Sequence, residues 1–140
     1  MRARERMFGA LLAVAVALAA SGCGGERAAP RGYERVAFQD LTADPAAYTG
    51  RRVRVTDGFW VSSFEQSVLT GALAESYPPQ AVEPFIWVTA EAEGDCITSD
   101  EAVSWGKVIA EGTFRFDEDG GFGHLGVYTM ELDDARLRCP

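Results

Sequence analysis

The sequence is poor in positive charge and contains almost no histidine or lysine. Of its 140 residues, 13 are Lys or Arg and 21 are Asp or Glu, so the formal net charge is -8. His124 is its single histidine and Lys107 its single lysine. A surface that neutralises a phosphate backbone needs clustered basic residues. The composition therefore argues against nucleic acid as a partner.

The chain also lacks the motifs of the common enzyme classes. It has no G-x-S-x-G turn for a nucleophilic serine, and its glycine-rich hairpin lacks the Lys and the helix of a phosphate-binding loop. We therefore expect a protein that is not an enzyme and needs no cofactor. The alternative is a hydrolase that depends on a metal or on carboxylates. Its candidate residues are His124, Asp117 and Asp119, and a carboxylate pair of Glu65 with Glu75, Glu91 or Glu93.

The first residues have the layout of an export signal. Arg2, Arg4 and Arg6 precede an uncharged, mostly aliphatic run from 7 to 20, and small residues lead from there to Cys23. The run is shorter than the about 20 residues that a spanning helix needs. The pattern predicts a signal peptide over 1–22 rather than a transmembrane helix.

The end of this signal resembles the lipobox of bacterial lipoproteins. The residues that carry the resemblance are Ala20-Ser21-Gly22-Cys23, with Ala20 where that motif most often has Leu. The resemblance implies that Cys23 is acylated and becomes the first residue, so that membrane lipid holds the protein without a spanning segment. Because Gly24 stands where Asp typically retains lipoproteins at the inner membrane, it also implies the periplasmic side of the outer membrane in a cell with two membranes.

The rest of the chain divides into a tether and one domain. The stretch from Gly24 to Gly32 is small, polar and interrupted by Pro30, which predicts a flexible tether over 23–32. The remaining segment, 33–140, has the length of a single globular domain. Within it, Asp44 and Pro45 predict a short helix over 44–48.

Patterns of apolar residues predict five strands in this domain, with alternation along 52–62 and 107–116 and apolar residues on both sides along 85–89. These strands cover 52–62, 65–73, 85–89, 107–116 and 123–132, the last continuing to 137. In the first strand the alternation places Phe59 and Val61 on the apolar face and Trp60 on the other, with a bulge or bend at Asp57-Gly58. The acidic segment between 91 and 104 is irregular, with one expected helical turn near 100–103.

Five strands, one short helix and bending glycines predict a mainly β, OB-like fold: a small, strongly curved, five-stranded antiparallel barrel. The segments 46–60, 84–88, 107–114 and 123–137 are similar to those of small bacterial lipoproteins and exported proteins with an OB-fold-like domain of uncharacterised function. This resemblance implies the fold and supplies no activity.

The three cysteines are an odd number, which would leave one thiol over in an exported protein. If Cys23 is acylated, Cys96 and Cys139 remain, and we expect a disulfide between them. The alternative is two unpaired buried thiols. A zinc site at these two cysteines lacks further ligands.

Three aromatic side chains are candidates for a binding face: Trp60, Trp87 and Tyr128. On an OB-like sheet they could stack on sugars, peptides or bases. The alternative is that they cap the barrel or pack under the loop at 74–83. The expected function is a lipid-anchored, non-enzymatic binding or scaffolding module for an unknown envelope protein or glycan.

Overall fold

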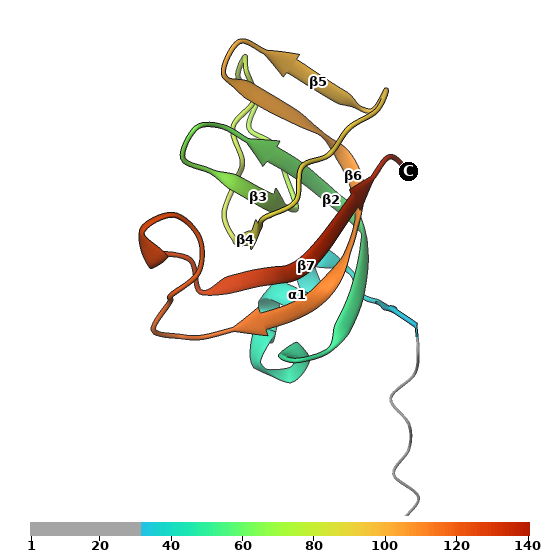
Figure 1. Ribbon diagram of the computed structural model, residues 1–140, viewed down its shortest axis with the longest axis vertical. Helices are drawn as coiled ribbons and strands as arrows, with labels where there is room; N and C mark the ends of the chain where they lie inside the picture. Colours follow the sequence, from blue (N-terminus) through green and yellow to red (C-terminus); the bar gives the residue numbers. More distant parts are fainter. Residues whose placement is uncertain (1–31) are drawn as a thin grey trace, which may run out of the picture.

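The computed structural model describes residues 32–140, so the expected signal peptide, Cys23 and all but the last residue of the expected tether lie outside the described residues. The elements, in order, are β1 (Glu34–Arg35), α1 (Phe38–Ala43), η1 (Pro45–Tyr48), β2 (Arg52–Ser62), β3 (Ser67–Thr70), β4 (Phe85–Val88), β5 (Ile97–Asp100), β6 (Val103–Phe116), η2 (His124–Gly126) and β7 (Met130–Arg138) (Figure 1). None of the helices in this part of the chain has the length and apolar character needed to cross a bilayer.

Five strands close into an OB-like barrel, as the sequence predicts. The strands follow the order β2-β3-β4-β7-β6, and β6 pairs again with β2. β4 and β7 run parallel and the other four pairs in the barrel are antiparallel. The barrel is therefore mixed rather than wholly antiparallel, because an odd number of strands cannot alternate in direction all the way round a closed ring.

A bulge in β2 decides which side chains of this strand face the core. Between Val55 and Gly58 the strand has one residue more than its partner β6. An odd insertion exchanges the two faces, so Val55 points inward before it and Trp60 points inward after it. Trp60 is 3% exposed and its indole N–H donates to the Ser67 hydroxyl at 3.2 Å. The prediction that Trp60 belongs to a binding face is wrong, because it carried the alternation through the bulge.

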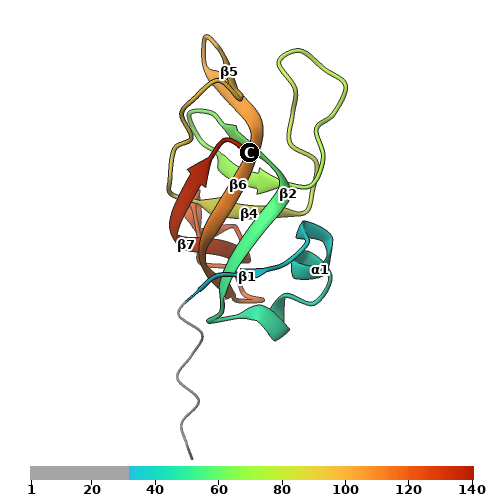
Figure 2. The same ribbon diagram turned by 90° about the vertical axis from the view of Figure 1, so that its right-hand side faces the viewer.

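A short helix that the sequence analysis missed covers one end of the barrel. The expected helix at 44–48 is the 3-10 helix η1, and α1 precedes it (Figure 2). α1 buries Phe38 and Leu41, which are 4% and 0% exposed. The Phe38 N–H donates to the Asp57 carboxylate at 2.9 Å, so the bulge of β2 also holds the start of this helix.

Two other elements of the structure differ from those predicted from the sequence. The expected helical turn near 100–103 is wrong, because Ile97–Asp100 and Val103–Gly106 form an antiparallel hairpin. The last strand begins at Met130 instead of 123, and the residues before it form η2 and turns. The short β1 pairs in parallel with β2.

The core fills the barrel and continues to α1. Its largest fully buried side chains are Phe114, Leu41, Leu69, Ile86 and Leu132. They come from β6, α1, β3, β4 and β7, and β2 adds the fully buried Val53 and Val55, so every strand of the barrel contributes. In β6 the alternation predicted from the sequence is confirmed, because Val108, Ala110 and Phe114 are all 0% exposed.

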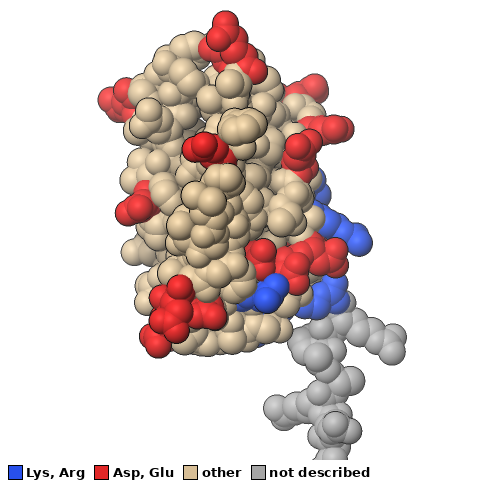
Figure 3. All heavy atoms as spheres, turned by 60° about the vertical axis from the view of Figure 1, so that its left-hand side comes forward, with Lys and Arg blue, Asp and Glu red and all other residues tan. Residues whose placement is uncertain are grey.

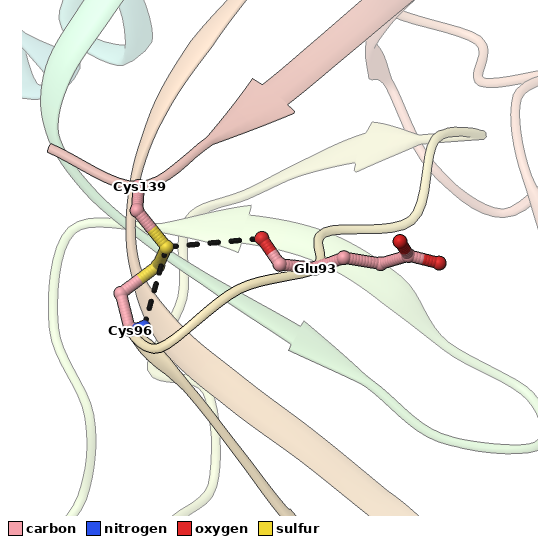
Figure 4. Close-up of a disulfide and its surroundings, with 3 residues drawn as sticks. All are labelled: Glu93, Cys96 and Cys139. Atoms are coloured by element: carbon pink, nitrogen blue, oxygen red, sulfur yellow. Dashed lines mark hydrogen bonds between the residues drawn. A yellow bond between two sulfur atoms is a disulfide. The ribbon is translucent and has the colours of Figure 1, made fainter.

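The expected disulfide joins Cys96 to Cys139, with Cα atoms 5.6 Å apart (Figure 4). The Cys96 N–H donates to the Cys139 sulfur at 3.2 Å, and the same sulfur lies 3.7 Å from the Glu93 carbonyl oxygen. The bond fastens the chain end after β7 to the loop that leads into β5.

Candidate functional site

Two loops far apart in the sequence meet beside strands β3 and β4 of the barrel. One is the turn 63–66 between β2 and β3, closed by the Ser63 N–H donating to the Gln66 carbonyl at 2.7 Å. The other is the β6–β7 connection, residues 117–129, which contains η2. In OB folds the loops at these two places of the topology flank the ligand-binding face. Figure 1 shows both loops on its left-hand side, opposite the point where the described chain begins.

Between the two loops lie two adjoining hollows of about 310 Å³ and 360 Å³. Both are lined by Ser63, Glu65, Gln66 and His124. The first hollow extends along β4 and the second along η2. We call the two hollows together the turn groove; its other lining residues are Ser62, Phe64, Ser67, Trp87, Val88, Thr89, Glu91, Leu125, Val127 and Tyr128.

An aromatic pair forms part of the wall of the turn groove. Trp87 alternates with Ile86 and Val88, which are fully buried, so its side chain points out of the barrel. The rings of Trp87 and Tyr128 lie 5.0 Å apart at 45°. Gly123, at φ 69°, packs against both rings, and a Cβ at this position would lie 2.5 Å from the indole. The turn before η2 therefore needs glycine for its backbone conformation and for this close approach.

Three apolar side chains stand at the rim of the turn groove, exposed to solvent. Phe64 is 96% exposed, Leu125 is 84% exposed and Val127 is 68% exposed. Leu125 also has a φ of 58°, a left-handed conformation that costs about 1–2 kcal/mol for a residue with a Cβ. An apolar side chain that is both exposed and strained is typical of a contact surface rather than of folding.

Apart from the turn groove, a hollow of about 400 Å³ lies under the β3–β4 connection at 71–84. It is lined by uncharged residues, among them Val61, Gln66, Tyr77, Gln80 and Phe85. The Tyr77 ring meets Trp105 edge-on at 5.9 Å. The negative charge of Asp100, and then the hydrogen bond that the phenol donates to this carboxylate, raise the pKa of Tyr77 above its usual value.

The structure brings some of the predicted site residues together and separates others. Trp87 and Tyr128 are in contact, and His124 lies in the same groove. Asp117 and Asp119 belong to a separate turn, in which the Asp119 N–H donates to the Asp117 carboxylate at 3.0 Å. Within residues 32–140, no three His, Cys, Asp or Glu side chains lie close enough to hold a metal ion.

Of the four glutamates that the sequence analysis considers for a hydrolase, two lie in the turn groove and two lie outside it. Glu65 and Glu91 line the turn groove together with His124, whereas Glu75 and Glu93 do not. In the described part of the chain, no hydrogen bond or ion pair connects His124 to a carboxylate. The orienting contact that a histidine base ordinarily has is therefore not formed by these side chains.

The sequence analysis missed the exposed apolar rim. Leu125 lies within the predicted strand 123–132 and Phe64 between the predicted strands 52–62 and 65–73, and the sequence analysis assigns no role to either side chain. Their signal is visible in the sequence: a large apolar residue inside a turn that is otherwise Ser, Glu, Gln, Gly and His departs from the polar composition of turns.

The charges of the domain are divided along the chain. The segment 55–106 has no Lys, Arg or His and nine Asp or Glu, and we call it the acidic half. Residues 32–54 and 107–140 have eight Lys or Arg and ten Asp or Glu, and we call them the arginine half. On the face shown in Figure 3 the basic side chains gather at the lower right. The turn groove lies where the two halves meet, with 62–67 and 87–91 on one side and 124–128 on the other.

Comparison of the chain with protein-family models, with curated proteins and with solved structures gives no match. The geometry of the turn groove is therefore the observation from which its function is inferred.

Proposed function

We propose that this chain is a lipid-anchored envelope protein whose OB-like domain is a non-enzymatic module that binds an envelope protein or glycan in the turn groove. The observation that carries the proposal is the exposed apolar rim, with Phe64 96% and Leu125 84% exposed beside the Trp87–Tyr128 pair. Exposed apolar side chains that are gathered round a groove favour an interaction site, whereas single exposed ones are ordinary.

The resemblance of residues 20–23 to a lipobox and the chemistry of the domain both support the anchor. The disulfide between Cys96 and Cys139 is typical of a protein in an oxidising compartment outside the cytoplasm. An acylated Cys23 followed by an extended tether over 23–32 would let the domain reach about 30 Å from the bilayer surface. The described chain begins on the side of the barrel opposite the 63–66 turn and the β6–β7 connection (Figure 1), so attachment through the tether would leave these loops accessible.

The anchor is tested by fractionation of Cys23→Ser in its own host. We expect the variant to leave the membrane fraction while the domain stays folded, because Cys23 precedes every described residue. A control, Ser21→Ala, keeps the cysteine and is expected to stay in the membrane. Recovery of Cys23→Ser in the membrane fraction would refute the anchor.

The groove is tested by photocrosslinking in native membranes. A photoreactive amino acid at position 64 is expected to give a crosslinked product, and the same group at position 75, outside the groove, is expected to give none. Leu125→Asn should abolish the product without lowering stability, because Asn tolerates the left-handed backbone that Leu125 adopts. A product that persists in Leu125→Asn would show that the groove is not the contact.

The same variants separate binding from hydrolysis. If the groove were a hydrolase site with His124 as base, His124→Gln would abolish turnover of envelope material and Leu125→Asn would spare it. A binding module has no turnover for His124→Gln to abolish, and it predicts loss of the crosslinked product in Leu125→Asn.

A further inference from the structure

The distribution of charge round the turn groove indicates what its partner carries. In the acidic half, nine carboxylates occur without a Lys, Arg or His. All ion pairs among the described residues belong to the arginine half, where Arg54 meets Glu111 and Arg115 meets Glu131. Glu65 and Glu91, which line the groove, therefore have no ion-pair partner within this part of the chain.

The groove wall has one side chain able to carry a positive charge, His124. The described domain as a whole has eight Lys or Arg against nineteen Asp or Glu. A field of this sign attracts cations to the surface and repels nucleic acid, anionic glycans and anionic lipid headgroups. It speeds the encounter with a cationic partner, an effect that salt screens.

The apolar side chains of the rim favour a protein over a glycan as the partner. Leu125 and Val127 are aliphatic, and Phe64 projects almost fully into solvent. Sugar hydroxyls buried against aliphatic side chains would lose their hydrogen bonds with water and find no partner there. Apolar side chains of a polypeptide have no such cost, and burial of apolar surface against the rim favours their binding.

Resting on the function proposed above, we propose that the turn groove binds a Lys- or Arg-bearing segment of an envelope protein. Apolar side chains of the segment would pack against Phe64 and Leu125. Its positive charges would face Glu65 and Glu91, which have no positively charged partner in the described chain.

The test measures binding of labelled peptides to the full chain by fluorescence anisotropy. The probe is a soluble peptide of Lys-Leu-Ser repeats, and its two controls are the same peptide with Glu in place of Lys and the same peptide with Ser in place of Leu. We expect the first to bind, the Glu peptide not to bind, and the Leu-free peptide to bind more weakly than the first. An oligomer of N-acetylglucosamine and a single-stranded oligonucleotide are expected not to bind.

Variants show whether the binding is in the groove. Glu65→Gln combined with Glu91→Gln should weaken the Lys-Leu-Ser peptide about threefold to tenfold, the effect of losing two exposed charge pairs. Glu75→Gln combined with Glu101→Gln makes the same change of net charge outside the groove and should leave the affinity within about twofold. Phe64→Ser, a change at a side chain 96% exposed, should weaken the peptide without affecting the fold.

The outcomes separate this inference from the function on which it rests. Equal weakening by the two double variants would mean that the peptide follows the overall charge, and it would overturn the inference. Binding of the sugar oligomer in preference to the Lys-Leu-Ser peptide would overturn it as well. A groove-dependent crosslink in membranes, together with no binding of the Lys-Leu-Ser peptide, would overturn the cationic segment alone and leave the binding module in place.

Discussion

The two halves of this domain treat their carboxylates in opposite ways. In the arginine half, strand register places opposite charges side by side: Arg54 lies directly across from Glu111, and Arg115 across from Glu131. In the acidic half, carboxylates such as Glu65 and Glu91 face solvent with no basic side chain in the same segment. Cross-strand pairs of opposite charge stabilise a sheet, and unpaired like charges do not. Charge pairing therefore stabilises the arginine half, whereas the carboxylates of the acidic half form no ion pair within the described residues.

The largest expected effect on the free energy of unfolding comes from reducing the disulfide that links the two halves. Cys96 belongs to the acidic half and Cys139 to the arginine half, and their bond closes a loop with a sequence separation of 43. Reduction should lower the free energy of unfolding by about 4 kcal/mol, because the unfolded chain regains the entropy that the cross-link removes. Chemical denaturation with and without reductant measures this.

The control is Cys96→Ser combined with Cys139→Ser, whose stability should not respond to reductant. Intact mass of the untreated protein should lie about 2 Da below that of its reduced form, as expected when two thiols become one bond. Two thiols that alkylate freely without reductant would contradict the disulfide.

The next effect is at the groove where the halves meet. Gly123→Ala should cost about 1–3 kcal/mol from its backbone, at φ 69° and ψ -162°, and more from the contact of the new Cβ with Trp87. Near-ultraviolet circular dichroism should change, because Trp87 and Tyr128 must move apart. Gly121→Ala is the control, since its φ is 117° but a Cβ there would meet nothing within 4 Å. An unchanged aromatic spectrum in Gly123→Ala would contradict the packing described.

A smaller effect on stability should differ between the two halves when one carboxylate is neutralised in each. Glu111→Gln removes the partner of Arg54 at 2.5 Å and of Arg138 at 3.6 Å, and should destabilise the domain by about 0.5–1 kcal/mol. Glu75→Gln removes a carboxylate from the half without basic residues and should leave stability unchanged or raise it slightly. Thermal denaturation at low and high salt measures both, and added salt should narrow the difference. Equal losses in the two variants would contradict the division into halves.

The smallest effect is a titration within the acidic half. Because Asp100 raises the pKa of Tyr77, Asp100→Asn should return that pKa toward its usual value. A tyrosine whose pKa is higher in the folded than in the unfolded chain favours folding while protonated, and this contribution is lost as the pH rises through the folded pKa. Ultraviolet absorbance of tyrosinate across alkaline pH follows the shift. A titration curve identical in Asp100→Asn and the unmodified chain would show that the two groups do not interact.

Much of the fold follows from local patterns in the sequence. The alternation in 107–116 places Val108, Ala110 and Phe114 in the core, as the structure has it. Five strands without a long helix indicate a small barrel, and the pair Cys96 and Cys139 indicates a disulfide. The alternation and the strands depend on residues close together in the chain, and the disulfide depends on the number of cysteines. These features can therefore be predicted without the tertiary structure.

The errors lie where a local pattern depends on a distant partner. The bulge at Asp57-Gly58 was predicted, but its effect on Trp60 follows only when the strand is set in register with β6. The hairpin of β5 with β6 replaced an expected helical turn, because pairing across strands outweighs a weak helical preference.

The sequence by itself determined the composition of the acidic half, the alternation that makes the barrel, and the cysteines that pair. Only the tertiary structure decided that the turn at 63–66 and the connection at 117–129 meet, and that Phe64, Leu125 and Trp87 therefore surround one groove. The physical reason is closure of the barrel. The register of β2 with β6 and the parallel pairing of β4 with β7 bring together segments about sixty residues apart in the chain, and nothing in the local pattern of either segment indicates the other.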